Sequence, residues 1–274
     1  MSRLRVHIQI HIPKWDFVIK STVSNKDHFL IWLYAAAVTA AEVVTAYYNP
    51  IYGVAGHVVL LVALLVHASL AYKQAIKLIY LSLSLAPMIR IMSLSMPLMG
   101  LPPIYWYLII SLPLFVTAAL VMQYAGFKPR EVGLIVGNLP LQLLVAFIGV
   151  PLGLIEYLIL KPTSLVPGLA LQHAWLPALI LLVSTGFLEE FIFRGIMYRA
   201  AVETLGRWYS IIYISFIFGA LHITHRSPVE LVFVFAVALL FSIIVDFFRS
   251  LLGVSLAHGI TNISLYIIWP YFLS

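Results

Sequence analysis

The sequence contains no cysteine and very little charge. Only 9% of its 274 residues are Asp, Glu, Lys or Arg, whereas a soluble globular domain carries roughly 25%. Because so few charges cannot cover a water-exposed surface, a water-soluble protein is excluded. The absence of cysteine excludes a disulfide-rich class, and 15 glycines with 63% hydrophobic residues exclude collagen-like and disordered classes. The absence of cysteine also excludes thiol nucleophiles, thiolate zinc sites and iron–sulfur clusters.

Long apolar stretches dominate what is present, since 63% of the residues are hydrophobic. A helix that crosses a bilayer needs about 20 apolar residues, and an even-stranded barrel would instead alternate apolar and polar residues. The sequence therefore predicts an all-α, multi-pass transmembrane helix bundle. The seventh apolar stretch is short, so eight and nine spans are both open. The nine stretches are Phe29–Tyr48, Ile51–Tyr72, Leu78–Ser95, Pro103–Gly126, Leu139–Leu160, Trp175–Met197, Trp208–Ile223, Val229–Phe248 and Leu252–Trp269.

The basic residues predict the orientation of these spans. With a cytoplasmic N-terminus, twelve Lys and Arg residues fall in inner segments and only Lys161 and Arg226 in outer loops. Basic residues concentrate on the cytoplasmic side of membrane proteins, so topology explains the net charge of +6 and no nucleic-acid partner is expected. We expect an integral protein of the cell membrane, in contact with lipids, whose oligomeric state the sequence does not specify.

The chain divides into four predicted parts. Residues 1–28 form a cytoplasmic N-terminal tail, in which the alternation over 5–12 predicts a short strand. Residues 29–126 form the N-terminal transmembrane helices, and residues 127–138 an interfacial connector with basic residues and two glycines. Residues 139–274 form the C-terminal transmembrane core.

Ionisable side chains inside the spans are costly, at about 3 to over 10 kcal/mol each, and by default indicate function. In the first three spans, Glu42, His67 and Arg90 could pair across helices or serve transport. Glu156 is expected in water near the outer end of its span. His225 is expected to be solvated near the outer interface.

The ionisable residues of the C-terminal half follow a helical spacing. Glu190 and Arg194 lie four residues apart and can pair, while Glu189 points about 140° away from Arg194. A buried carboxyl group without a cation beside it suits a general base, so Glu189 is the candidate base.

Two further helices carry polar pairs at the same spacing. A neutral His222 imidazole could share the attacking water and pass its proton onward. The N–H groups of His258 and Asn262, one turn apart, can point at a single oxygen and form an oxyanion hole. Together these groups predict a polar cavity within the membrane, in which Phe218 contributes packing.

One geometric difficulty accompanies this interpretation. With the spans above, Glu189 lies 14 residues from the outer end of its span and His222 lies 14 residues from the inner end of its own. On straight helices their depths in the bilayer then differ by roughly 10 to 20 Å. Contact requires one of the two spans to be shifted along the membrane normal.

The ordered motifs resemble those of the CAAX protease and bacteriocin-processing family, which includes the type II CAAX prenyl endopeptidases. The resemblance covers about residues 170 to 270, and it implies that residues 139–274 contain a catalytic core. It implies a glutamate-dependent intramembrane endopeptidase that cleaves near the C-terminus of a lipidated, CAAX-like or hydrophobic substrate. It also implies that Glu189 and His222 activate water, that His258 and Asn262 form the oxyanion hole, and that the other motif residues support the site. The motifs are Glu189-Glu190-x-x-x-Arg194, Phe218-x-x-x-His222 and His258-x-x-x-Asn262.

Four alternatives remain open from the sequence. A zinc protease could use Glu189, His222 and His258 as ligands, although no H-E-x-x-H motif is present and neither a metal nor a cofactor is expected. A serine mechanism would have to use Ser255 beside His258. An aspartyl mechanism needs two intramembrane Asp residues, and only Asp246 is a candidate. A transporter, or a non-catalytic immunity or scaffold protein, is the alternative from another functional class.

Overall fold

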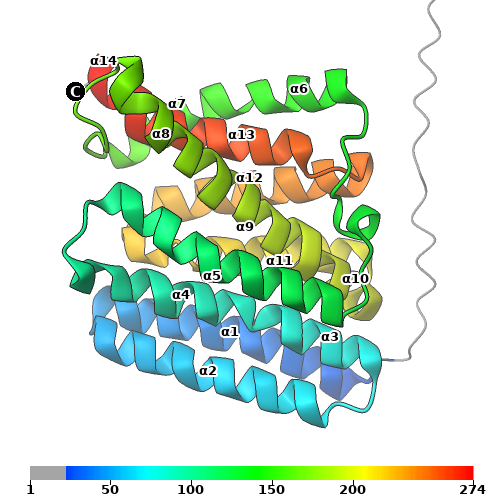
Figure 1. The fold of residues 1–274 in the computed structure, drawn as a ribbon. Helices are drawn as coiled ribbons and strands as arrows, with labels where there is room; N and C mark the ends of the chain where they lie inside the picture. The colour runs from blue at the N-terminus through cyan, green and yellow to red at the C-terminus, as the bar shows by residue number, and fades with distance from the viewer. Residues whose placement is uncertain (1–22, 274) are drawn as a thin grey trace, which may run out of the picture.

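The computed structural model describes residues 23–273, and within that range it is a bundle of helices with no strand (Figure 1). Eight helical stretches are long and apolar enough to cross a membrane, which confirms the predicted all-α multi-pass architecture. The strand predicted over 5–12 lies outside the described residues. The eight stretches are α1 (Asn25–Tyr47), α2 (Pro50–Leu70), α3 with α4 (Gln74–Ser95), α5 (Pro103–Tyr124), α6 with α7 (Leu139–Leu160), α8 to α10 (Leu171–Leu205), α12 (Pro228–Phe248) and α13 with α14 (Leu252–Phe272).

Several of these helices begin at a recognisable cap. Ser24 and Asp27 form a capping box at the start of α1, and the side chain of Asn49 accepts a hydrogen bond from the backbone N–H of Ile51. Ser227 caps α12 in the same way, and Pro228 follows it at the first helical position. Proline suits this position because the first N–H groups of a helix have no partner within it. The chain thus marks helix starts locally, while apolar length sets their extent.

The sixth stretch is a single bent helix that crosses the bundle obliquely in Figure 1. It consists of α8 (Leu171–Leu181), the π-helical segment η3 (Leu182–Phe187), α9 (Leu188–Glu190), the π-helical segment η4 (Phe191–Met197) and α10 (Tyr198–Leu205). The two candidate glutamates of α9 therefore lie between two π-helical segments. Such segments are rare and are frequently found at functional sites.

The boundary predicted at Met197 is wrong, and its correction removes the difference in depth between Glu189 and His222. The helix continues to Leu205, and the chain then turns at Gly206, whose φ of 75° is unfavourable for other residues. The next helix, α11 (Arg207–Ala220), follows at once. Glu189 lies 17 residues before Gly206 and His222 lies 16 residues after it, so both are roughly 25 Å from the turn.

Helix α11 accounts for the ambiguity in the number of spans. It contains 14 residues, which corresponds to about 21 Å and is shorter than a hydrocarbon layer of about 30 Å. Its last turn is followed by the 3₁₀ segment η5 (Ile223–His225). His222 therefore lies just beyond the end of α11, not within a long span as its sequence suggested.

The predicted connector is compact and packs against the turn before α13. It contains the 3₁₀ segment η2 (Pro129–Val132). The backbone N–H of Leu251 donates to the carbonyl of Gly133, and the hydroxyl of Ser250 donates to the carbonyl of Ile135. Glu131 of the connector pairs with Arg199 of α10. These contacts tie the connector to two helices of the C-terminal core.

Glycines let α13 (Leu252–Ile263) approach the glutamate-bearing helix closely. A Cβ atom at Gly186 of η3 would lie 2.6 Å from the backbone nitrogen of Gly259, a distance that real Cβ atoms do not tolerate. Small residues at helix interfaces in membranes permit such backbone approach. Because Gly259 follows His258 directly, the contact brings His258 next to Glu189 and Glu190.

In the N-terminal half, the predicted pairing of charges across helices holds in part. Arg90 of α4 (Leu85–Ser95) donates to both carboxylate oxygens of Glu42 in α1. His57 of α2 lies 2.9 Å from the same carboxylate. His67, however, is not part of this cluster, because its Nδ1 hydrogen-bonds to the hydroxyl of Tyr34 at 2.7 Å.

Candidate active site

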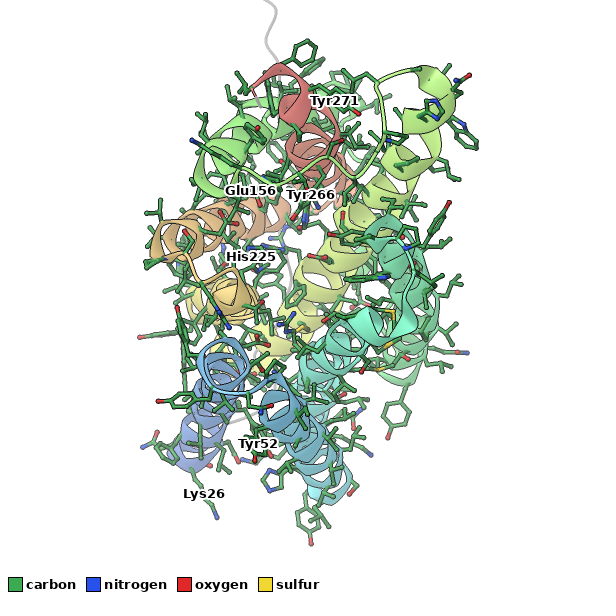
Figure 2. All side chains as sticks on the ribbon, turned by 90° about the vertical axis from the view of Figure 1, so that its left-hand side faces the viewer. Lys26, Tyr52, Glu156, His225, Tyr266 and Tyr271 are labelled. Atoms are coloured by element: carbon green, nitrogen blue, oxygen red, sulfur yellow. The ribbon has the colours of Figure 1, made fainter. Side chains whose placement is uncertain are left out.

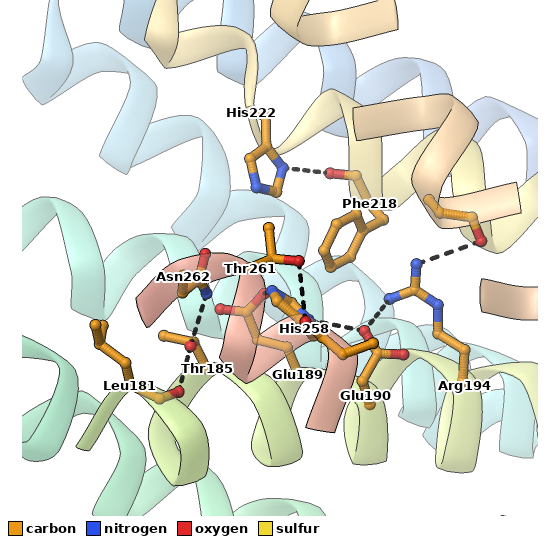
Figure 3. Close-up of polar contacts among 12 residues, drawn as sticks. Leu181, Thr185, Glu189, Glu190, Arg194, Phe218, His222, His258, Thr261 and Asn262 are labelled. Carbon is orange, nitrogen blue, oxygen red and sulfur yellow. Dashed lines mark hydrogen bonds and ion pairs between the residues drawn. The ribbon is translucent and has the colours of Figure 1, made fainter. Parts of the chain in front are cut away.

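A cavity of about 170 Å³, here called the central cavity, lies among the helices of the C-terminal half. All seven candidate site residues line it, and they come from the sixth helical stretch, α11 with its following turn, and α13. Figure 3 shows their polar contacts. The tertiary structure therefore brings together every residue that the three motifs singled out. They are Glu189, Glu190, Arg194, Phe218, His222, His258 and Asn262.

Glu190 is fully buried and has two basic partners. Arg194 donates from Nη1 to Oε1 of Glu190 at 3.0 Å, which is the ion pair that the spacing predicts. Nδ1 of His258 lies 2.8 Å from the same oxygen. Since an ion-paired carboxylate only accepts hydrogen bonds, this geometry assigns a proton to Nδ1 of His258. The sequence predicted the first contact and missed the second.

Glu189 has a different environment from its neighbour. Its side chain is 30% exposed, and its Oε2 atom lies 3.9 Å from Nε2 of His258. Adjacent residues on a helix point in different directions, so Glu189 faces the cavity while Glu190 faces the buried Arg194. Glu189 is thus the carboxyl group with access to a water molecule in the cavity.

The orientation of His222 is set by its own helix end. Nδ1 of His222 lies 2.8 Å from the carbonyl oxygen of Phe218. A carbonyl only accepts, so Nδ1 carries the proton, and in the neutral ring Nε2 is an acceptor. A water molecule in the cavity could donate to that nitrogen.

Asn262 is held by a residue that the sequence did not indicate. Its Nδ2 atom donates to Oγ1 of Thr185 at 2.8 Å, and the Thr185 hydroxyl donates in turn to the carbonyl of Leu181 (Figure 3). One N–H of the Asn262 amide is therefore engaged, which leaves the second for another acceptor. Thr185 lies four residues before Glu189, a spacing that places it on the same side of the helix.

Phe218 supports the site through packing, as expected. The guanidinium carbon of Arg194 lies 4.3 Å from its ring centroid, within the range of a cation–π contact. The ring also lies 5.0 Å from that of His222 and 6.0 Å from that of His258. Phe218 thus packs against three of the polar residues of the site.

Glu156 differs from its sequence prediction, whereas His225 is exposed, as its sequence position predicted. Glu156 is only 9% exposed and lines the central cavity, so the expectation that it lies in water near the outer end of its span is wrong. His225 lines the same cavity, and its Nδ1 lies 3.5 Å from a carboxylate oxygen of the buried Glu230. Viewed along the helices in Figure 2, Glu156, His225 and Tyr266 lie in the same region. Nothing in the local sequence shows that the side chain of Glu156 turns inward.

The alternative nucleophile and acid lie outside the central cavity. Ser255 lines a separate apolar groove beside the connector. Asp246 is hydrogen-bonded to Tyr198 at 2.6 Å and is paired with Arg207 near the Gly206 turn. No group of three His, Asp or Glu side chains in residues 23–273 is arranged to hold a metal ion.

Comparison with known proteins finds one family similarity, and it covers the part of the chain that carries the candidate site. The family model of the Rce1-like type II CAAX prenyl endopeptidases matches residues 171–264. These residues are similar to an Rce1-like domain. The matched stretch contains all seven candidate site residues and the π-helical segments on both sides of Glu189. No curated protein and no solved structure shows significant similarity to the chain. The N-terminal spans, which contain Glu42 and Arg90, lie outside the Rce1-like match.

Proposed function

We propose that the protein is a glutamate-dependent intramembrane endopeptidase that cleaves a peptide bond near the C-terminus of a lipidated, CAAX-like or hydrophobic substrate. The observation that carries the proposal is the convergence of Glu189, His222, His258 and Asn262 on one cavity. The Rce1-like match supports a CAAX-type protease. A substrate with an apolar tail is consistent with a site that lies among membrane-spanning helices. We also propose that the protein lies in the cell membrane with its N-terminus in the cytoplasm.

The proposed reaction begins with a water molecule between Glu189 and His222. Glu189 accepts a proton from the water as its oxygen attacks the carbonyl carbon of the scissile bond, while Nε2 of His222 orients the water. The C–N bond of the tetrahedral intermediate then breaks, and the proton passes from Glu189 to the leaving amine. The first products are a new C-terminal carboxylic acid and an amine, the acid then gives its proton to the amine to leave a carboxylate and an ammonium group, and Glu189 is restored as a carboxylate.

The oxyanion of the intermediate is assigned to His258 and Asn262. Asn262 supplies the amide N–H that does not contact Thr185. Because Nδ1–H of His258 donates to Glu190, Nε2 donates to the oxyanion only when the ring carries both protons. This arrangement gives Glu190 a role that its spacing did not suggest, which is to hold the His258 ring with its Nε2 atom toward the reacting group.

The test is cleavage by purified, lipid-reconstituted protein. A farnesylated peptide and an unmodified apolar peptide of the same sequence are compared, in H₂¹⁸O, by mass spectrometry. We expect one ¹⁸O atom in the new carboxyl group, loss of at least about 10²-fold in kcat for Glu189→Gln, and no loss after strong chelation. Persistent cleavage by Glu189→Gln refutes the glutamate mechanism, and loss on chelation followed by recovery with Zn²⁺ favours the zinc alternative.

Glu203→Gln serves as the matched control. Glu203 pairs with Arg199 at the same four-residue spacing as Glu190 and Arg194, but its side chain is 30% exposed and far along the helix from the central cavity. Its removal is expected to leave cleavage unchanged. If no peptide is cleaved while the protein changes solute flux in vesicles, the transporter alternative replaces the peptidase.

A further inference from the structure

A second cavity of about 190 Å³, here called the Arg90 cavity, adjoins the central cavity on the side of the N-terminal helices. Glu189, Phe218, His222 and His225 line both cavities. The proposed base and its histidine partner therefore lie where the two cavities meet. An extended peptide whose scissile bond lies at Glu189 would have its two ends in different cavities.

The walls of the Arg90 cavity are apolar, but one of its residues is strongly basic. Aliphatic side chains from α4, α5 and the glutamate-bearing helix line most of it. Arg90, which is 11% exposed, is the cationic group. The aliphatic residues are Ile89, Ile110, Leu114, Leu188, Ile192 and Leu221. A chain of apolar residues that ends in a negative charge matches this lining.

Arg90 is held in one orientation by an ion pair with Glu42. Its Nε and Nη2 atoms donate to the two oxygens of Glu42, a bidentate pair that fixes the guanidinium plane. His57 contacts the same carboxylate at 2.9 Å, and both Glu42 and His57 are fully buried. The ion pair with Glu42 uses the guanidinium edge formed by Nε and Nη2. The edge formed by Nη1 and Nη2 is not used by Glu42.

Two hydroxyl groups flank that remaining edge. Nη1 lies 3.3 Å from Oγ of Ser93, and Nη2 lies 3.2 Å from Oγ1 of Thr224. Both hydroxyls line the Arg90 cavity, and both distances are at the long end for hydrogen bonds. The guanidinium donates to both hydroxyls, and the Ser93 hydroxyl donates to the carbonyl oxygen of Arg90 at 3.2 Å. The second N–H of Nη1 and the Thr224 hydroxyl remain as donors on this edge, and Ser93 joins them when its hydroxyl turns from the carbonyl, so that one planar carboxylate can accept from all three.

The charges of the two cavities favour opposite ends of a peptide. The central cavity is lined by Glu156, Glu189 and Glu190, with Arg194 as their counter-charge. A carboxylate placed there meets like charges in a poorly solvated site. Of these three carboxyl groups only Glu189 also lines the Arg90 cavity, and there Arg90 is a preoriented cation.

We propose that the Arg90 cavity binds the part of the substrate that follows the scissile bond, a few apolar residues ending in a free α-carboxylate, and that Arg90, Ser93 and Thr224 bind this carboxylate. The inference rests on the proposed peptidase function and extends it to the chemistry of the substrate's end. It also assigns a use to the Glu42–Arg90–His57 cluster, which lies outside the Rce1-like match.

The first experiment needs no variant. Two substrates of identical sequence, one with a free C-terminal carboxylate and one amidated, are cleaved by the wild-type protein in lipid. We expect kcat/KM for the free acid to exceed that for the amide by at least about tenfold, since a charge-assisted hydrogen bond is lost. Equal kcat/KM values overturn the inference while leaving the peptidase proposal intact.

The second experiment tests whether the Arg90 cavity causes the preference for the free-acid substrate. Thr224→Val and Ser93→Ala remove the flanking hydroxyls without leaving Glu42 unpaired, so both are expected to fold. Each should reduce the preference for the free acid by at least about threefold, and the double variant by more. Thr117→Val is the matched control, because the Thr117 hydroxyl donates only within its own helix, to the carbonyl of Pro113. A preference that is unchanged in the double variant overturns the assignment to this cavity.

A binding measurement separates this inference from the peptidase proposal. Glu189→Gln protein in lipid nanodiscs is titrated with a short apolar peptide in its free-acid and amidated forms. Stronger binding of the acid, lost in the Ser93→Ala and Thr224→Val background, supports the cavity even if no substrate is cleaved. Equal binding of the two forms counts against it even if cleavage is efficient.

Discussion

Nδ1 of His258 lies 2.8 Å from Oε1 of Glu190, the same oxygen that accepts a hydrogen bond from Arg194. One buried carboxylate therefore neutralises an arginine of its own helix and orients a histidine of another. The adjacent Glu189 has no such partner within hydrogen-bond distance and faces the cavity. The surrounding helices thus give two neighbouring glutamates different environments.

The first prediction concerns Glu190. Glu190→Gln should leave Arg194 buried without a counter-charge, at a cost of about 3–5 kcal/mol in the free energy of unfolding. It should also lower kcat more than it raises KM, because His258 loses its orientation. Thermal unfolding and steady-state kinetics measure the two effects. Equal kcat per folded molecule in wild-type and variant protein would show that Glu190 is only structural.

The second prediction concerns the contact between Asn262 and Thr185. Thr185→Val removes the hydroxyl that accepts from Nδ2 of Asn262 and should lower kcat by about tenfold, less than the 10²–10³-fold expected for loss of an oxyanion donor itself. Thr185→Ser keeps the hydroxyl and should retain most activity. Equal rates for the two variants would contradict a positioning role for Thr185.

The third prediction tests the close helix contact beside the site. Gly186→Ala places a methyl group 2.6 Å from the backbone nitrogen of Gly259, so α13 must shift or strain must be accepted. We expect a loss of about 1–3 kcal/mol in stability and a fall in kcat, because His258 moves with Gly259. Gly168→Ala is the control, since no atom lies within 4 Å of a Cβ at that position. Equal stability and equal kcat of the two variants would contradict the claim that close backbone contact at Gly186 positions His258.

The fourth prediction is a pH dependence at the connector. Burial raises the pKa of Glu131, but the backbone N–H of Lys128 and the Arg199 guanidinium lower it more, so the pKa lies below its ordinary value of 4.5. A lowered folded-state pKa stabilises the protein above about pH 4.5, and this contribution is lost as the pH falls through the folded-state value. Because the side chain is 34% exposed, solvent screening limits the contribution to about 1 kcal/mol.

The measurement is thermal unfolding at pH 7 and pH 4 for the wild type and Glu131→Gln. The variant should lose less stability than the wild type between the two values, because it lacks the group that is protonated. An identical fall in both proteins would show that the Glu131 contacts do not contribute to the pH dependence.

Features that depend on one helix at a time could be predicted from the sequence. Apolar length identified the spans, and the four-residue spacing identified the pair of Glu190 and Arg194. The order of the three motifs identified the family that the match to residues 171–264 supports. These features are local, because hydropathy and helical periodicity act over a few turns of the same chain.

Features that depend on the rotation and register of one helix against another could not be predicted. The second partner of Glu190, the bond from Asn262 to Thr185 and the inward position of Glu156 all arise between helices. The cluster of Glu42 with Arg90 was only one of several pairings open to the first three spans, and His67 joined Tyr34 instead.

The sequence by itself determined that this is a helical membrane protein and which side chains are chemically suited to hydrolysis. Only the tertiary structure decided that these side chains meet. The turn at Gly206 sets Glu189 and His222 at equal depth, and the contact of Gly186 with Gly259 brings His258 to the glutamates. The physical reason is that backbone approach between helices depends on the absence of side-chain atoms at particular points, which is a property of pairs of surfaces and not of any one segment.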